Sequence, residues 1–218
     1  IRIISIVIYN WKNNVDFLAL SYVRDEQDVL EVVDMLIESD NNHCEVIAKI
    51  ENATAIENID EIAKVSDGLM VARGDLGIEM SIEKLPLYQK TILKKAREYE
   101  KIGIVATDLL HSMENNSVPS RAEVSDIYNA IVSNCDAVLL SGETTIGNYP
   151  VETVKAMTKI IESAEEDFDY FIVENIQNAC LQNDEDMIFD AIKNEAIACT
   201  YLDDVDYDKV HINTKFLM

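Results

Sequence analysis

Residues 68–77 read GLMVARGDLG, and this stretch decides the fold. An apolar run ends at Ala72 and is followed at once by Arg73, Gly74 and Asp75. Side chains two apart on an extended strand share a face, so the cation and the acid are expected to point the same way. The pattern predicts a buried strand that presents polar groups at its carboxyl end.

The same arrangement of an apolar run, a polar residue, one spacer and an acid occurs twice more. Lys49 and Glu51 flank Ile50, and Ser141 and Glu143 flank Gly142. If the parent strands lie parallel, their carboxyl ends meet at one rim. Two cations and three carboxylates would then share a small volume, which is the makeup of a metal-assisted phosphate or carboxylate site.

Five short apolar runs predict strands that are apolar on both faces, as buried parallel strands are. Between them, apolar residues recur with helical spacing, and the strand-to-strand period of roughly 20 to 35 residues fits a βα unit. The strands are expected at 17–20, 46–50, 68–71, 102–106 and 137–140. The helical stripes are Val29, Val32, Val33 and Leu36; Tyr88, Ile92, Ala96 and Tyr99; and Val124, Ile127, Tyr128 and Ile131.

Consecutive βα units fit either an open α/β sheet or part of a (β/α)8 barrel. An open sheet gathers its ligand at one switch point, usually with a glycine-rich first turn, and no GxGxxG or GxxxxGK[ST] occurs here. Barrels instead draw their chemistry from several strand ends. We therefore predict a partial (β/α)8 barrel of the α/β class. A complete barrel needs about 250 residues, so we expect a fragment truncated at both ends.

The composition narrows the range of partners. The 218 residues are 48% hydrophobic, enough for a substantial core, and the formal net charge is −23. The long-range field of such a chain repels nucleic acid and anionic membranes, so neither is expected as a partner. The opening apolar run, residues 1–9, is far shorter than the roughly 20 residues of a membrane span. An anionic substrate would need local capture by Lys49, Arg73 and a bound cation.

Cysteine and histidine spacing gives no zinc signature. The four cysteines form no CxxC pair, and the three histidines show no ligand spacing. We expect reduced thiols in a cytoplasmic compartment and histidines at the surface.

The polar residues at each strand end can be interpreted as chemical groups of a site or as purely structural ones. Because Lys49 lies in an apolar run, its ammonium needs a partner, which could be Glu51 or a bound phosphate or enolate. With Glu51, Asp75 would suit Mg²⁺ or Mn²⁺ better than zinc, although residues 73–77 alone could be only a turn. Thr107 could hold a substrate oxygen, carry a proton or cap a helix, and Ser141 could also be a cap.

Five motifs closely resemble those of pyruvate kinase, in the same order and at similar spacing. The match spans roughly residues 15–166 and implies the last five strands of the catalytic barrel. The motifs are FLALSYVR at 17–24, IAKIEN at 47–52, MVARGDLG at 70–77, SRAEVSD at 120–126 and LLSGET at 139–144.

The resemblance implies a set of site residues and a reaction. Lys49 would neutralise the transferring phosphoryl group and the enolate, and Glu51 and Asp75 would hold Mg²⁺. The implied reaction is phosphoryl transfer from phosphoenolpyruvate to ADP in glycolysis, giving pyruvate and ATP. The substrate carboxylate would be received by Ala72, Gly74, Asp75 and Thr107. Arg73 would either orient the rim or support Glu51, and Ser141 and Glu143 would support the rim. Arg121 would lie near a subunit interface.

The chain also departs from the family pattern. Asp108 follows Thr107 where the family usually has glutamine, which could weaken anion binding. Residues 1–14 lack the family's Thr-x-Lys-Asp signature, and the lid, the first three barrel strands and the K⁺ ligands lie outside this chain. K⁺ and a homo-oligomer, a tetramer in the family, are still expected of the full-length protein.

Three functions stay open from the sequence. The first is a pyruvate kinase whose isolated chain turns over weakly or not at all. The others are a non-catalytic relic that acts as an interaction module, and a metal-dependent barrel lyase acting on pyruvate enolates. We expect a barrel domain at residues 1–168, then a linker and the start of a C-terminal α/β domain at 169–218, with a helix at 187–202.

Overall fold

The computed structural model describes residues 15–39, 41 and 43–182, with side chains up to residue 166. Contacts divide the chain into two compact units, Ile1–Ile161 and Glu162–Met218. The expected boundary at residue 168 remains a prediction. The expectations for residues 1–14 and for a helix at 187–202 lie outside the described residues.

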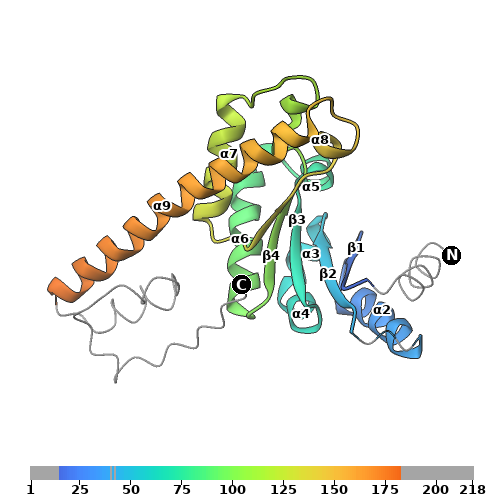
Figure 1. Ribbon diagram of the computed structural model, residues 1–218. Coiled ribbons are helices and arrows are strands. Elements are labelled where there is room, and N and C mark those ends of the chain that lie inside the picture. The colour runs from blue at the N-terminus through green and yellow to red at the C-terminus, as the bar shows by residue number, and fades with distance from the viewer. Residues whose placement is uncertain (1–14, 40, 42, 183–218) are drawn as a thin grey trace. The chain divides into compact units, whose positions relative to one another are not determined.

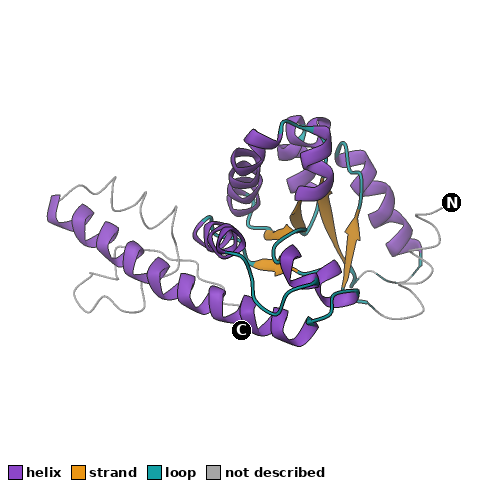
Figure 2. Ribbon diagram, turned by 90° about the horizontal axis from the view of Figure 1, so that it is seen from above, coloured by secondary structure: helices purple, strands orange, loops and turns teal. Residues whose placement is uncertain are grey.

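The first unit is built on five parallel strands in sequential order. Viewed from above, they form an arc with helices along its outer side (Figure 2). Adjacent sequential parallel strands with helical crossovers are the repeat of a (β/α)8 barrel, so the partial barrel prediction is confirmed. The strands are β1 (Phe17–Leu20), β2 (Glu45–Ile50), β3 (Gly68–Ala72), β4 (Ile102–Ala106) and β5 (Ala137–Leu139).

Helices follow every strand, as Figure 1 shows. The three helical stripes of the sequence fall in α2, α6 and α7, with Tyr99 at the carboxyl-terminal cap of α6, so those helices are confirmed. Pro86 lies in the first turn of α6, where its missing N–H costs no helical hydrogen bond. The helices are α2 (Glu26–Glu38), α3 (Ala53–Glu57), α4 (Ile59–Val65), α5 (Arg73–Glu79), α6 (Leu85–Glu98), α7 (Arg121–Val132), α8 (Gly142–Thr145) and α9 (Pro150–Gln182), with 3₁₀ turns η1 (Ile82–Lys84) and η2 (His111–Glu114).

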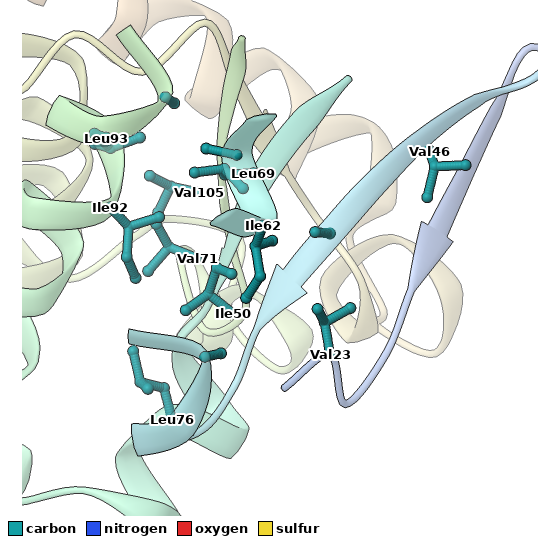
Figure 3. Close-up of a cluster of buried hydrophobic side chains, with 14 of the residues drawn as sticks. Val23, Val46, Ile50, Ile62, Leu69, Val71, Leu76, Ile92, Leu93 and Val105 are labelled. Atoms are coloured by element: carbon teal, nitrogen blue, oxygen red, sulfur yellow. The ribbon is translucent and has the colours of Figure 1, made fainter. Parts of the chain in front are cut away.

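The main core lies between the strands and the helices on their outer side. Leu69 and Val71 of β3 pack there in one cluster with Ile62 of α4 and Ile92 and Leu93 of α6 (Figure 3). Each of these side chains is buried and contributes about 1.5 to 3 kcal/mol through removal from water. This face of the sheet is what holds α4 and α6 in place.

The other face of the sheet carries a smaller apolar cluster of Ile47, Met70 and Ala106, with Ile104 packed against it. Strand alternation puts Lys49 on the same face as Ile47. The residue two positions on, Glu51, continues this face beyond the strand end. Lys49 and Glu51, the site residues of β2 and its end, therefore lie on the concave side of the arc.

Acids at the amino ends of two strands tie each strand to its neighbour. Asp67, just before β3, accepts a hydrogen bond from the Val46 amide of β2 at 2.8 Å. Asp136, just before β5, accepts one from the Gly103 amide of β4 at 2.7 Å. Both amides lie at buried residues, so each carboxylate satisfies a backbone donor. The repeated contact fixes strand pairing at the edge opposite the site.

The expectation that all five strands are buried on both faces was wrong for the outer two. β3 is buried along its whole length, but β1 has one buried residue, Leu18, and β5 has none, the others in both strands being exposed or half-buried. Phe17 in β1 and Leu139 in β5 are more than a third exposed. Each of these strands has a hydrogen-bonded neighbour on one side among the described residues, so less of its surface is covered.

Candidate active site

Lys49 and Glu51 form an ion pair at the carboxyl end of β2. Lys49 Nζ lies 2.6 Å from Glu51 Oε1 and donates to Ser21 Oγ at 2.9 Å. The Glu51 side chain is only 1% exposed, and its Oε2 accepts a hydrogen bond from the Tyr22 amide at 2.6 Å. The loop after β1 thus holds both charged groups. The expectation that Lys49 requires a partner, with Glu51 as a candidate, is confirmed.

Glu51 keeps acceptor capacity for a cation. Its Oε1 is buried and makes no hydrogen bond of good geometry, although the Lys49 ammonium lies close by. A carboxylate oxygen has two lone pairs, so Oε1 can accept a second positive group. This orphaned oxygen on the rim fits a hard divalent ion.

Asp75 lies on the same rim, in the first turn of α5 after β3, and is half-buried. Among the residues described, no group of three or more histidine, cysteine or acidic side chains could hold a metal. Mg²⁺ keeps several waters and commonly uses only one or two carboxylates, so Glu51 and Asp75 suffice in number. Their roles as metal ligands remain predictions.

Arg73 and Gly74 hold the end of β4. The Arg73 side chain is 9% exposed, and its Nε and Nη2 both donate to the Thr107 carbonyl oxygen, at 3.1 and 2.7 Å. The Gly74 amide donates to Thr107 Oγ1 at 2.8 Å, and that hydroxyl donates to the Ala106 carbonyl. The residues that directly follow β3 and β4, far apart in sequence, therefore meet at one point.

Three alternatives raised by the sequence for these residues are wrong: a helix cap at Thr107, support of Glu51 by Arg73 and a bare turn after β3. Thr107 caps no helix, because η2 begins four residues later and its cap position is Leu110. Arg73 contacts Thr107 and Asp126 rather than Glu51. The stretch after β3 is more than a turn, since Arg73 opens the two-turn helix α5. The cap residue Ala72 makes no side-chain bond to this helix, but the Gly74 amide in its first turn donates to Thr107 Oγ1.

Glu143 joins the loops after β4 and β5. The side chain is buried, and its two oxygens accept from the Leu110 amide at 3.1 Å and the Ser141 amide at 2.9 Å. Ser141 stands at the cap position of α8, but its side chain makes no capping bond there. Glu143 thus links these two loops, and its role as a support of the active rim stays a prediction.

A second carboxylate, Glu123 at the start of α7, fastens the η2 turn. It accepts from the Ser112 amide and hydroxyl, at 2.6 and 2.5 Å, and completes a capping box with Ser120. Burial raises the pKa of Glu123, but the hydrogen bonds from Ser112 and Ser120 outweigh it and hold that pKa below its ordinary value.

Sequence reasoning missed three contributors to the rim. Ser21 and the Tyr22 amide bind the charged pair of β2, and Asp126 binds Arg73. Ser21 follows directly after a predicted strand, so its position was a usable signal. Asp126 lies in the middle of a helix, where nothing in the local pattern links it to a strand end.

The residue that departs from the family pattern, Asp108, points to solvent. Its side chain is 71% exposed and lies 3.8 Å from His111 Nδ1. The exposed carboxylate is well screened by water, which limits its effect on a neighbouring anion. His111 is also exposed, and His43 lies at the surface, which confirms the predicted surface placement of these two histidines.

The comparison with known families decides the affiliation of the chain. A family model described as the barrel domain of pyruvate kinase matches residues 3–154. The chain belongs to the pyruvate kinase family. The ordered motifs at the strand ends are therefore those of pyruvate kinase.

Curated pyruvate kinases share close to half of their matched residues with the chain. That of Methanocaldococcus jannaschii is 49% identical over 156 residues, covering 72% of this chain and 35% of its own length. That of Bacillus licheniformis is 49% identical over 160 residues, covering 73% and 27%. That of Thermotoga maritima is 45% identical over 184 residues, covering 80% and 39%. The chain thus spans about a third of the length of these pyruvate kinases.

No helix among the described residues is both long and apolar enough to cross a membrane. Disulfides are also absent where the structure describes cysteines, at Cys44 and Cys135. Burial raises the pKa of the Cys44 thiol, helped by the nearby Asp16 carboxylate.

Proposed function

We propose that this rim serves phosphoryl transfer between phosphoenolpyruvate and ADP, giving pyruvate and ATP, together with barrel units outside this chain. The observation that carries the proposal is the Lys49 ammonium, held by buried Glu51 on the concave face of a pyruvate kinase barrel segment. A fixed cation at this place stabilises charge on a phosphoryl group or an enolate without any rearrangement.

Lys49 has the donor capacity for this role. An ammonium has three N–H groups; the hydrogen bond to Ser21 Oγ uses one, and Glu51 Oε1 lies 2.6 Å from the same nitrogen as an ion-pair partner. A remaining N–H would bind an oxygen of the transferring phosphoryl group. Its pairing with Glu51 holds the Lys49 ammonium in place, so the chemistry would begin from a set position.

The substrate carboxylate would be received at the start of α5. Thr107 Oγ1 and the backbone at Ala72, Gly74 and Asp75 line this point. The Gly74 amide already donates to Thr107 Oγ1, so a bound carboxylate would share or replace that bond. Arg73 would fix Thr107 through its two hydrogen bonds to the Thr107 carbonyl oxygen. Ser141 and Glu143 would support the loop that follows β4.

Glu51 and Asp75 would hold the divalent metal, Mg²⁺ or Mn²⁺. When bound, the metal would neutralise oxygens of the phosphoryl group and the enolate as a Lewis acid. We further propose that K⁺ binds through residues outside this chain. The full-length protein would act in cytoplasmic glycolysis as a homo-oligomer.

Metal binding tests the site on this chain alone. Calorimetric titration with Mn²⁺ should reveal one site whose affinity falls at least tenfold in Glu51→Gln and in Asp75→Asn. Glu57→Gln, an exposed acid on α3, is the matched control and should bind as the parent does. A site that persists unchanged in both rim variants would contradict the proposed ligands.

Activity needs the remainder of the barrel. We suggest replacing the matching segment of the Methanocaldococcus jannaschii pyruvate kinase with residues 15–161 and assaying turnover of phosphoenolpyruvate and ADP. Turnover that is lost in Lys49→Met supports the proposal. A folded but inactive chimaera that binds no Mn²⁺ would favour the non-catalytic relic, and turnover of pyruvate without nucleotide would favour the lyase.

A further inference from the structure

The end of β4 has an unusual backbone. Thr107 and Asp108 follow the strand with φ angles of 70° and 53°, both in the left-handed region. A β-branched residue such as threonine rarely adopts this conformation, because its branched Cβ crowds the backbone. Asp tolerates it better, since its short polar side chain is compatible with left-handed geometry. Something in the surrounding structure must therefore hold Thr107.

Arg73 is the group that holds the carbonyl of Thr107. Two of its N–H groups converge on this one oxygen, at 3.1 and 2.7 Å. The guanidinium is nearly buried, so these bonds are shielded from water. From the same segment, the Gly74 amide fixes the hydroxyl of Thr107. Both ends of the strained residue are thus bound to the first residues of α5.

Asp126 in α7 completes this chain of contacts. Its Oδ2 lies 2.5 Å from Arg73 Nη1, the arm of the guanidinium that faces away from Thr107. A planar guanidinium has a fixed donor geometry, so fixing one arm also sets the direction of the other two donors. Asp126 itself touches neither Thr107 nor Gly74 in any contact described here.

We propose that Asp126 is a positioning residue for the substrate-carboxylate site. Through Arg73 it keeps Thr107 left-handed, so that the hydroxyl of Thr107 stays against the Gly74 amide at the start of α5. The purpose of this placement rests on the proposed function, but the contact chain itself can be tested without substrate.

The test is amide hydrogen exchange and methyl NMR on the full 218-residue chain. In Asp126→Asn, exchange of the Gly74 amide should rise at least tenfold relative to the Val105 amide in β4, and the Thr107 methyl resonance should shift. Asp34→Asn, an exposed acid on α2, is the matched control and should change neither signal. A merely structural role would raise both amides equally.

A second variant separates positioning from folding. Thr107→Ser keeps the hydroxyl but removes the branched methyl, so the left-handed conformation is less strained. In that background, Asp126→Asn should raise Gly74 exchange clearly less than in the parent. If Asp126→Asn fails to fold, Asp126→Glu takes its place, because it keeps the charge but moves it one methylene further out. The ratio of Gly74 to Val105 exchange rates is then measured in that variant. The proposal is overturned if the ratio of Gly74 to Val105 exchange rates stays unchanged and the Thr107 methyl resonance does not shift. It is also overturned if the exchange rates of both amides rise equally.

Oxalate, a dianion shaped like the pyruvate enolate, links the result to function. With Mg²⁺ present, Asp126→Asn should weaken oxalate binding at least tenfold. If the chimaera that carries residues 15–161 fails to bind oxalate but the exchange ratio responds as expected, the proposed function fails and the positioning role stands. If oxalate binds equally to both while the ratio is unchanged, the positioning role alone fails.

Discussion

Lys49 Nζ lies 2.6 Å from Glu51 Oε1, so the two charged residues that flank Ile50 in sequence meet on the concave face of the barrel segment. The carboxylate is almost fully buried, whereas the lysine side chain is 22% exposed. A buried acid of this kind depends on its partner, because a lone charge away from water is costly.

Lys49→Met should therefore lower the free energy of unfolding by about 2 kcal/mol. This is less than the 3 to 5 kcal/mol for fully buried pairs, since water reaches the ammonium. Urea denaturation measures the loss. The double variant Lys49→Met with Glu51→Gln should recover part of it, because the glutamine is neutral and still accepts from the Tyr22 amide. If the double variant loses more free energy of unfolding than the two single variants together, this coupling is contradicted.

Gly147, after α8, should not tolerate a side chain. A Cβ there would lie 2.4 Å from the Glu143 carbonyl oxygen and 3.1 Å from Glu114 Cα, both backbone atoms. We expect Gly147→Ala to destabilise the fold by about 1 to 3 kcal/mol, as overpacking does.

The matched control is Gly77→Ala, inside α5, where the nearest atom to a new Cβ is Leu85 Cδ2 at 3.9 Å. Alanine favours helix over glycine by about 1 kcal/mol, so this variant should be neutral or stabilising. Thermal unfolding of both variants compares them directly, and equal melting temperatures would show that the space around Gly147 opens readily.

Glu123 should make stability depend on acid pH. Its pKa is lower in the folded chain than its ordinary value of 4.5, so its contribution is fully present above pH 4.5 and is lost as pH falls through the folded pKa. Glu123→Gln should cost about 1 kcal/mol at pH 7, and the gap to the parent should close below pH 4.5. Urea midpoints from pH 3 to 7 test this; a gap that does not depend on pH would refute it.

Asp136 should stabilise the sheet at the amino ends of the strands. Asp136→Ala leaves the Gly103 amide without its acceptor, at a cost of about 1 to 2 kcal/mol. Asp136→Asn keeps an oxygen in the same place and should cost much less. Exchange of the Gly103 amide reports the bond directly, and equal protection in the two variants would show that water replaces the carboxylate.

Much of the fold was readable from local pattern. The apolar runs and helical stripes placed the strands within a residue or two, and the strand-end motifs placed the rim. α3, α4, α5 and α8 were missed because they are short, between four and seven residues, and show too few turns for a helical period. The exposure of β1 and β5 was missed because hydrophobicity alone does not tell a central strand from an outer one.

The sequence by itself determined the repeating βα units, the placement of Lys49 and Glu51 at the carboxyl end of one strand and of Asp75 just after the next, and the family. Apolar periodicity and strand alternation are local properties of the chain, so no long-range contact is needed to foresee these features. Tertiary structure alone decided that Arg73 turns to Thr107 and Asp126, which lie 34 and 53 residues further along the chain. That choice depends on which side chains folding brings within hydrogen-bond distance, and such distances are not encoded in any short stretch of sequence.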